Sequence, residues 1–164
     1  MKQKLNFEKV FLEQKENVWK LVSKYVYKKE DKEDLFQDVF INIHKALPRF
    51  RGESALATWI YKITVNTAIN FLKKQNRYSW LENAISNLRI IEPQKPPEDA
   101  NESQVLSLLD SLNPQQRMII LLADVEEKKL DNIAELMKLP VGTVKSNLHR
   151  ARKILRASLA KLGH

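Results

Sequence analysis

The sequence of 164 residues contains no cysteine and only three glycines. Without cysteine the chain cannot form a disulfide framework, a CxxC zinc site or a thiol nucleophile, and the absence fits a reducing compartment. Three histidines in all argue against a histidine-rich metal site. The scarcity of glycine argues against a glycine-rich phosphate loop or an α/β nucleotide fold. It favours long helices.

Long apolar runs are absent too. Acidic residues interrupt the N-terminal segment 1–15 early, which is not typical of a signal peptide. No later stretch is apolar for long enough to span a bilayer. We therefore expect a soluble, cytoplasmic protein.

What is present is an uneven distribution of charge. The chain is 43% apolar and carries a net charge of +8, which is typical of a folded, basic protein. The net charge is +7 over residues 1–80, −4 over 81–115 and +5 over 116–164. The acidic part includes 92–103, which holds three of the six prolines and cannot bury enough apolar surface to offset its ordering entropy. We therefore predict two domains, 1–80 and 105–164, joined by a flexible acidic linker over 81–104.

Apolar residues recur at helical spacing in both basic blocks, and no long stretch alternates with period two. The sequence therefore predicts an all-α fold. Apolar stripes run from Phe7 to Tyr25 and from Leu35 to Leu47, where Pro48 ends the helix. The charged run 28–34 interrupts the first stripe and leads into the second helix. Further helices are expected over about 55–77, 130–137 and 141–162, and one more should begin at the start signal Asn113, Pro114 and Gln116.

The last two expected helices form the first informative motif. In the second of them Val144, Leu148, Ala151 and Leu155 fall within about 60° of one another and make one narrow core seam. The opposite arc carries only basic and polar side chains, with Arg152 at its margin: Lys145, Ser146, His149, Arg150, Lys153 and Arg156. A short helix, a tight turn and a basic second helix indicate a helix-turn-helix, whose second helix lies in the major groove. Residues near its start would read base edges, and the later cations would lie near phosphates.

The alternative interpretation is an amphipathic surface helix with a solvated basic face, because charged helix faces are common. Three facts favour the helix-turn-helix. The face has no acidic residue and so lacks the i,i+4 pairs that support a solvated helix. It ends a chain of net positive charge, and it follows a helix and a turn of suitable size.

The helix expected over 55–77 carries the second motif. Five polar or cationic side chains share about 80° of arc on this helix: Lys62, Asn66, Asn70, Lys73 and Arg77. Aromatic rings stand nearby at Phe50, Trp59 and Tyr61. Cations hold phosphates, amides read unstacked bases and rings offer stacking surfaces, so the combination favours binding of single-stranded DNA. Taken singly, Phe50 and Trp59 are better explained by core packing.

The helix before it has a polar face formed by Asp34, Gln37, Asp38 and Asn42. Acids at i and i+4 can suggest a metal site, but no histidine or cysteine stands on that face. We expect a protein-contact face or a plain solvated face there, and neither a metal nor a cofactor.

Three segments together resemble a known family: DLFQDVF at 34–40, FRGESALATWIYKITVN at 50–66 and LPVGTVKSNLHRAR at 139–152. In this order and spacing they are similar to bacterial RNA polymerase sigma factors of the extracytoplasmic-function group, of the sigma-E type. With their flanks they cover nearly the whole chain. The chain departs from the family pattern at Asn147, where arginine is usual, at Asn132, where an acid is common, and over 127–130, which leads into the helix-turn-helix.

The resemblance implies that the first domain binds the clamp helices of the polymerase largest subunit and the minus-ten element. The second domain would bind the minus-thirty-five element and the polymerase flap. The implied partners are core RNA polymerase, promoter DNA and an anti-sigma factor, often a membrane protein with a cytoplasmic domain. Neither a small-molecule substrate nor a catalytic residue is implied.

The resemblance also assigns site residues by position. The polymerase-contact helix would carry Asp34, Gln37 and Asp38. The loop that takes a flipped non-template base would comprise Phe50, Arg51, Gly52, Glu53 and Ser54, with Trp59 and Asn66 supporting the pocket and Lys62 and Asn70 beside the strand. The recognition helix would carry Thr143, Lys145, Ser146, His149, Arg150 and Arg152.

These observations predict a sigma factor. One alternative is a stand-alone transcriptional regulator that uses only the C-terminal helix-turn-helix, with the N-terminal block as a sensor or dimerisation unit. The polar arc and the aromatic loop of the N-terminal block argue against it. A second alternative is a metal-dependent nuclease, which the acids on one polar face support poorly because no second carboxylate motif converges on them.

Overall fold

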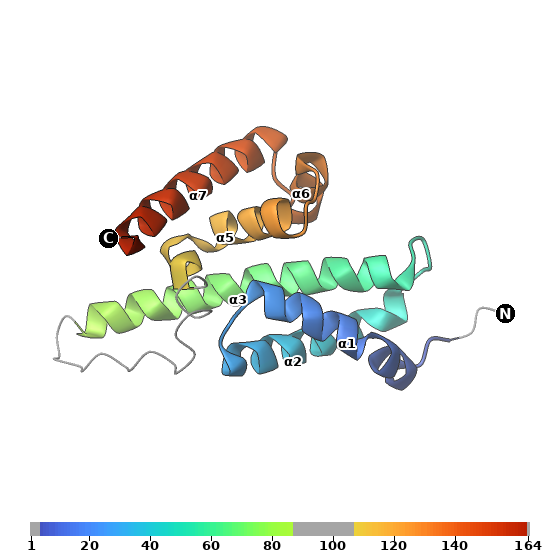
Figure 1. Cartoon of the computed structure of the whole chain (residues 1–164). Coiled ribbons are helices and arrows are strands. Elements are labelled where there is room, and N and C mark those ends of the chain that lie inside the picture. Colours follow the sequence, from blue (N-terminus) through green and yellow to red (C-terminus); the bar gives the residue numbers. More distant parts are fainter. Residues whose placement is uncertain (1–3, 87–106, 164) are drawn as a thin grey trace. The chain divides into compact units, whose positions relative to one another are not determined.

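The computed structural model describes residues 4–86 and 107–163, and every regular element in these ranges is helical (Figure 1). This confirms the predicted all-α class. In chain order the elements are α1 (Phe7–Tyr25), α2 (Lys29–Ala46), the 3₁₀ turn η1 (Leu47–Arg49), α3 (Leu56–Ser86), the 3₁₀ turn η2 (Leu108–Ser111), α5 (Pro114–Ile120), the π-helical turn η3 (Leu121–Val125), α6 (Leu130–Met137) and α7 (Val141–Leu162).

The chain forms two compact units, Met1–Ala68 and Ile69–His164, so the division falls inside α3. The sequence places the end of the third helix near residue 77, but α3 continues to Ser86 because neither proline nor glycine interrupts 78–86. The first residues of the predicted linker, 81–86, are therefore helical. The rest of that linker lies outside the described residues, and the domain boundaries at 80 and 105 stay a prediction.

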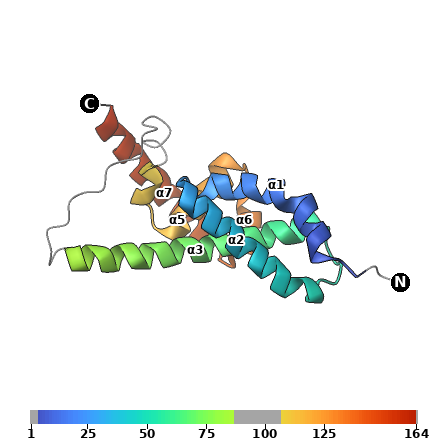
Figure 2. The same ribbon diagram turned by 90° about the horizontal axis from the view of Figure 1, so that it is seen from below.

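The first unit is built on the pairing of α1 with α2, which lie side by side in Figures 1 and 2. Val18 and Val22 of α1 and Leu35, Val39 and Ile43 of α2 are fully buried. Aromatic rings also join the two helices, with the centroids of Phe11 and Phe40 4.8 Å apart and those of Trp19 and Phe36 5.6 Å apart. The apolar stripes read from the sequence are therefore core stripes.

The charged run 28–34 leads into the second helix as expected, and most of it is already helical, because α2 begins at Lys29. Glu30 and Asp31 occupy its first turn, where negative charge interacts favourably with the positive end of the helix dipole. α2 ends at Ala46, and Pro48 lies in the 3₁₀ turn that follows.

The second unit contains the helix-turn-helix. α5 begins with the predicted capping box: Asn113 Oδ1 accepts from the backbone N–H of Gln116 (2.8 Å), and Gln116 Oε1 accepts from that of Asn113 (3.2 Å). α6 ends at Met137 and is capped by Lys138, which adopts left-handed backbone angles; α7 begins three residues after this cap. Ile133 of α6 and Val144 of α7 are fully buried. The order short helix, tight turn, long helix is therefore as predicted.

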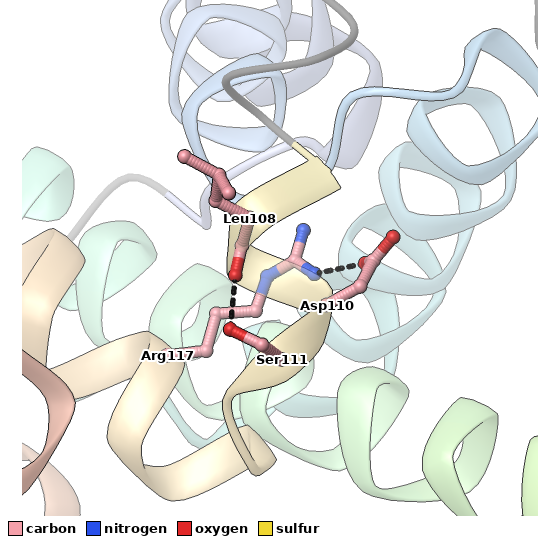
Figure 3. A network of polar contacts seen from close by, with 4 residues as sticks. All are labelled: Leu108, Asp110, Ser111 and Arg117. Atoms are coloured by element: carbon pink, nitrogen blue, oxygen red, sulfur yellow. Dashed lines mark hydrogen bonds and ion pairs between the residues drawn. The ribbon is translucent and has the colours of Figure 1, made fainter. Parts of the chain in front are cut away.

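A buried arginine ties η2 to α5 (Figure 3). The Arg117 side chain is 8% exposed, and its Nη1 lies 3.1 Å from Oδ1 of Asp110. In η2 itself, Ser111 Oγ donates to the backbone oxygen of Leu108. A buried cation is tolerated only when opposite charge and hydrogen bonds replace its hydration. Asp110 therefore helps to stabilise the second unit.

Asp110→Ala should lower the free energy of unfolding by about 1–3 kcal/mol, because it leaves the Arg117 guanidinium buried without this carboxylate. Thermal unfolding of the full chain, followed by circular dichroism, measures the change. The control is Glu13→Ala, which removes the exposed partner of Lys9 at 3.9 Å. It should change the free energy by less than about 0.5 kcal/mol. Equal effects of the two substitutions would contradict this role of Asp110.

Candidate nucleic-acid and polymerase interfaces

The exposed face of α2 carries the three residues expected to contact polymerase. Asp34, Gln37 and Asp38 are all exposed, whereas the neighbouring Leu35 and Val39 are buried. Asn42, one turn further along the polar face, donates from Nδ2 to Thr67 Oγ1 of α3 at 3.0 Å. The polar face is thus accessible to a protein partner over 34–38, while Asn42 connects α2 to α3.

The loop before α3 presents the predicted flipped-base residues at the surface. Arg51, Gly52, Glu53 and Ser54 are exposed, and Phe50 is half-buried. Gly52 adopts φ 73°, in the left-handed region that favours glycine. A Cβ at this position would meet no atom within 4 Å, so the requirement for glycine here comes from the backbone angle and not from lack of space.

Phe50 and Trp59 pack against each other where the loop meets α3. Their ring centroids are 4.8 Å apart, with the planes tilted by 47°. Both side chains are half-buried, so each keeps part of its surface open to solvent. The two rings therefore form a pair at the surface. They are neither fully buried in the core nor fully free for stacking, which are the two arrangements that the sequence left open.

The polar arc on α3 is exposed as the helical wheel predicts. Lys62, Asn66, Asn70, Lys73 and Arg77 are all exposed, whereas Ile60, Val65 and Leu72 are buried. Two buried threonines on α3 satisfy their hydroxyls within the helix: Thr64 Oγ1 donates to Ile60 O (2.8 Å), and Thr67 Oγ1 donates to Ile63 O (2.6 Å). These two threonines are therefore bonded inside the unit, whereas the arc of cations and amides is accessible to solvent.

On α7 the buried seam and the basic arc separate as predicted. Val144, Leu148 and Ala151 are buried, and Leu155 is half-buried. The arc itself is exposed: Lys145, Ser146, His149, Arg150, Lys153 and Arg156. Thr143 is half-buried, and its backbone oxygen accepts from Ser146 Oγ at 3.1 Å.

Asn147 does not belong to the exposed arc. It is 7% exposed, and its Nδ2 donates to the backbone oxygen of Thr143 at 2.9 Å. The position at which the resemblance expects arginine therefore faces the interior of the unit in this chain. An amide suits it, because a short neutral group can complete a local hydrogen bond where a cation would need a charged partner.

Arg152 is exposed but is not free. Its Nη2 lies 2.6 Å from Oδ1 of Asp124, and its Nε donates to Oδ2 at 3.1 Å. The hydrogen bond to Asp124 raises the pKa of the Arg152 guanidinium above its usual value. Asp124 belongs to η3, and sequence reasoning missed it because it stands 28 residues away at the end of an apolar run.

The residues that the structure describes hold no group of three or more metal-ligating side chains. Within the same ranges, none of the helices combines the length and apolarity that crossing a bilayer requires.

Comparisons with known proteins agree with this arrangement. Residues 11–78 match the model of Sigma-70 region 2, and residues 102–155 match that of Sigma-70, region 4. The ECF RNA polymerase sigma-E factor of Escherichia coli is 36% identical over 151 residues, covering 82% of this chain and 76% of that protein. The factor of the same name from Haemophilus influenzae is 32% identical over 154 residues, covering 87% of this chain and 81% of that protein.

Solved structures show a similar fold. The sigma factor RpoE of Bartonella quintana, in complex with the anti-sigma factor NepR, has a TM-score of 0.63 at 23% identity, covering 94% of this chain and 96% of that one. CnrH, in complex with the cytosolic domain of CnrY, has a TM-score of 0.59 at 21% identity, covering 94% and 88%. At these identities the likeness speaks for the fold alone.

Gly52→Ala should lower the free energy of unfolding by about 1 kcal/mol, because an L side chain at φ 73° is strained even where space is open. Gly142→Ala is the matched control: its Cβ would also meet no atom within 4 Å, but it lies in the first turn of α7. That substitution should leave stability unchanged or raise it by up to about 1 kcal/mol. Chemical denaturation of both variants makes the comparison, and a tolerated Gly52→Ala would show that the loop does not need this backbone angle.

Proposed function

The chain belongs to the extracytoplasmic-function sigma factors of the sigma-70 family, which direct transcription initiation by RNA polymerase, and we propose that separate exposed faces of its two units bind polymerase and the two promoter elements. The observation that carries this proposal is the acid-free arc of exposed cations and polar groups on α7, the second helix of a helix-turn-helix. Residues 102–155, which include most of α7, match region 4, and residues 11–78 match region 2. The second match gives the N-terminal block a role in initiation instead of the sensor role that a stand-alone regulator would give it.

In the second functional domain, proposed as 105–164, α7 lies in the major groove of the minus-thirty-five element. Lys145, Ser146 and His149 lie in the first turns of the helix and read base edges, and Thr143 precedes them. Arg150 lies further along, where the helix passes the phosphates. Arg152 belongs to the same surface by position, at its margin.

In the first functional domain, proposed as 1–80, the loop before α3 and the exposed arc of α3 capture the melted minus-ten strand. Arg51 and Lys62 offer charge to phosphates, and Asn66 and Asn70 offer amides to unstacked bases. The loop residues Phe50, Gly52, Glu53 and Ser54, with Trp59, form the surface that receives a flipped base. The linker 81–104 separates this domain from the second.

The proposed polymerase contact is the exposed face of α2 with Asp34, Gln37 and Asp38. A magnitude supports the need for this partner. Opening on the order of ten base-pair steps at ~1.4 kcal/mol each costs about 14 kcal/mol, whereas stacking returns ~1–3 kcal/mol per captured base. A few captured bases do not cover that cost, so the chain acts as a subunit of the polymerase holoenzyme in the bacterial cytoplasm. We assign no catalytic step to its own residues.

An anti-sigma factor is the remaining proposed partner. Support comes from the fold shared with RpoE, a sigma factor whose structure was solved with the anti-sigma factor NepR. Such a partner would hold the chain away from polymerase until a signal releases it.

Run-off transcription with core polymerase over a promoter library tests the proposed function. Lys145→Ala should lose preference for the upstream element by about tenfold, and Asn66→Ala should lose preference for the downstream element by a similar factor, since one good base contact contributes ~1–3 kcal/mol of discrimination.

Each variant has a matched control on an exposed position. Lys161→Ala removes the same charge from the last turn of α7, and Asn17→Ala removes the same amide from α1. Both controls should transcribe like the unchanged chain. Unaltered preferences in Lys145→Ala and Asn66→Ala would count against these site residues, and no promoter-directed transcription by the unchanged chain would count against the function.

A further inference from the structure

One acidic side chain from outside α7 lies against the margin of its basic arc. Asp124, in η3, meets Arg152 through two hydrogen bonds, with Oδ1 2.6 Å from Nη2 and Oδ2 3.1 Å from Nε. After Glu135 the sequence contains no acidic residue, so α7 has no anion of its own to offer. The anion on this face therefore comes from another element, 28 residues earlier in the chain.

The geometry of this pair is the geometry with which arginine binds phosphate. A guanidinium presents parallel N–H groups in a planar fork, which match the two oxygens of a carboxylate or of a phosphodiester. Asp124 already engages two of these donors. Both side chains are still accessible, at 45% exposure for Arg152 and 40% for Asp124, so the pair can be reached and opened from solvent.

We propose that Asp124 limits the affinity of the second unit for duplex DNA by holding Arg152 in an ion pair that competes with the phosphate backbone. This inference rests on the proposed function of α7. Sequence-independent binding grows with the number of phosphates that a protein neutralises. Because one arginine is paired internally, the chain binds DNA of arbitrary sequence less tightly than its number of cations suggests. Its affinity for a specific site then depends more on the base contacts near the start of α7.

The competing explanation is that the pair only fixes α7 against η3. In that case Asp124 and Arg152 contribute to stability alone, and an exposed pair contributes little, about 0–1 kcal/mol. The two explanations differ in the expected effect on DNA binding. An orienting pair predicts unchanged or weaker binding when either partner is removed, whereas a competing pair predicts tighter binding when the carboxylate is neutralised.

The experiment measures binding of the full chain to a fluorescein-labelled 25-base-pair duplex of arbitrary sequence, by anisotropy between 50 and 200 mM NaCl. Asp124→Asn should bind roughly three- to tenfold more tightly at the lower salt concentrations. The slope of log K against log salt should become steeper by about 0.9, the value for one additional phosphate contact. Glu16→Gln, which removes the same charge from an exposed site on α1, should change neither quantity.

Arg152→Gln, alone and combined with Asp124→Asn, completes a double-mutant cycle for the pair. In the unchanged chain it should weaken binding by less than about twofold, because the arginine is engaged by Asp124. In the Asp124→Asn background it should abolish the gain in affinity and the added slope. A gain that persists in the double variant would show that the carboxylate acts by plain repulsion and would overturn the proposal. A three- to tenfold loss on Arg152→Gln alone would overturn it too, and this arm does not require Asp124→Asn to fold.

Lys145→Ala separates failure of this inference from failure of the proposed function. If the unchanged chain binds the duplex and Lys145→Ala weakens that binding, α7 is a DNA-binding surface, and an unaltered affinity in Asp124→Asn then refutes only the inference. If the unchanged chain does not bind the duplex even at 50 mM NaCl, the inference fails, because there is no affinity for Asp124 to limit, whereas the run-off transcription test still decides the proposed role of α7.

Discussion

The burial of one side of each long helix determines what that helix can present to a partner. On α7, burial of Val144, Leu148 and Ala151 against the rest of its unit turns Lys145 and His149 outward, because the helical repeat places them on the opposite side. On α3, burial of Ile60 and Val65 exposes Lys62 and Asn66 in the same way. The candidate DNA-binding faces are thus a geometric consequence of core packing, and their chemistry follows from which residues occupy the outward positions.

Features set within one helix could be predicted from the sequence. The capping box at Asn113, the extent of α7 and the separation of its seam from its arc all depend on residues within a few turns of one another. The charged run 28–34 leads into α2 as predicted, but the helix starts earlier than its apolar stripe indicates: 29–34 forms the first turns of α2, because acids suit a helix start. The all-α class and the membership in the sigma factors were confirmed, whereas the roles of individual site residues stay predictions.

Features that depend on tertiary contact could not be predicted. Nothing local to Asp124 indicates that it meets Arg152, and nothing local to Asn147 indicates that it faces inward and bonds the oxygen of Thr143. Phe50 and Trp59 could be proposed as aromatic candidates, but their mutual packing follows from how the loop meets α3. These contacts matter more for the surface than for the fold, since they determine which polar groups are available to a partner.

In the proposed function this chain captures melted DNA only as a subunit of RNA polymerase. Permanganate reactivity of unpaired thymines tests that claim most directly, on promoter DNA incubated with the chain alone, with core polymerase alone and with both. We expect reactive thymines around the minus-ten element only when both are present. Promoter opening by the chain alone, or by core polymerase to the same extent without it, would contradict the account.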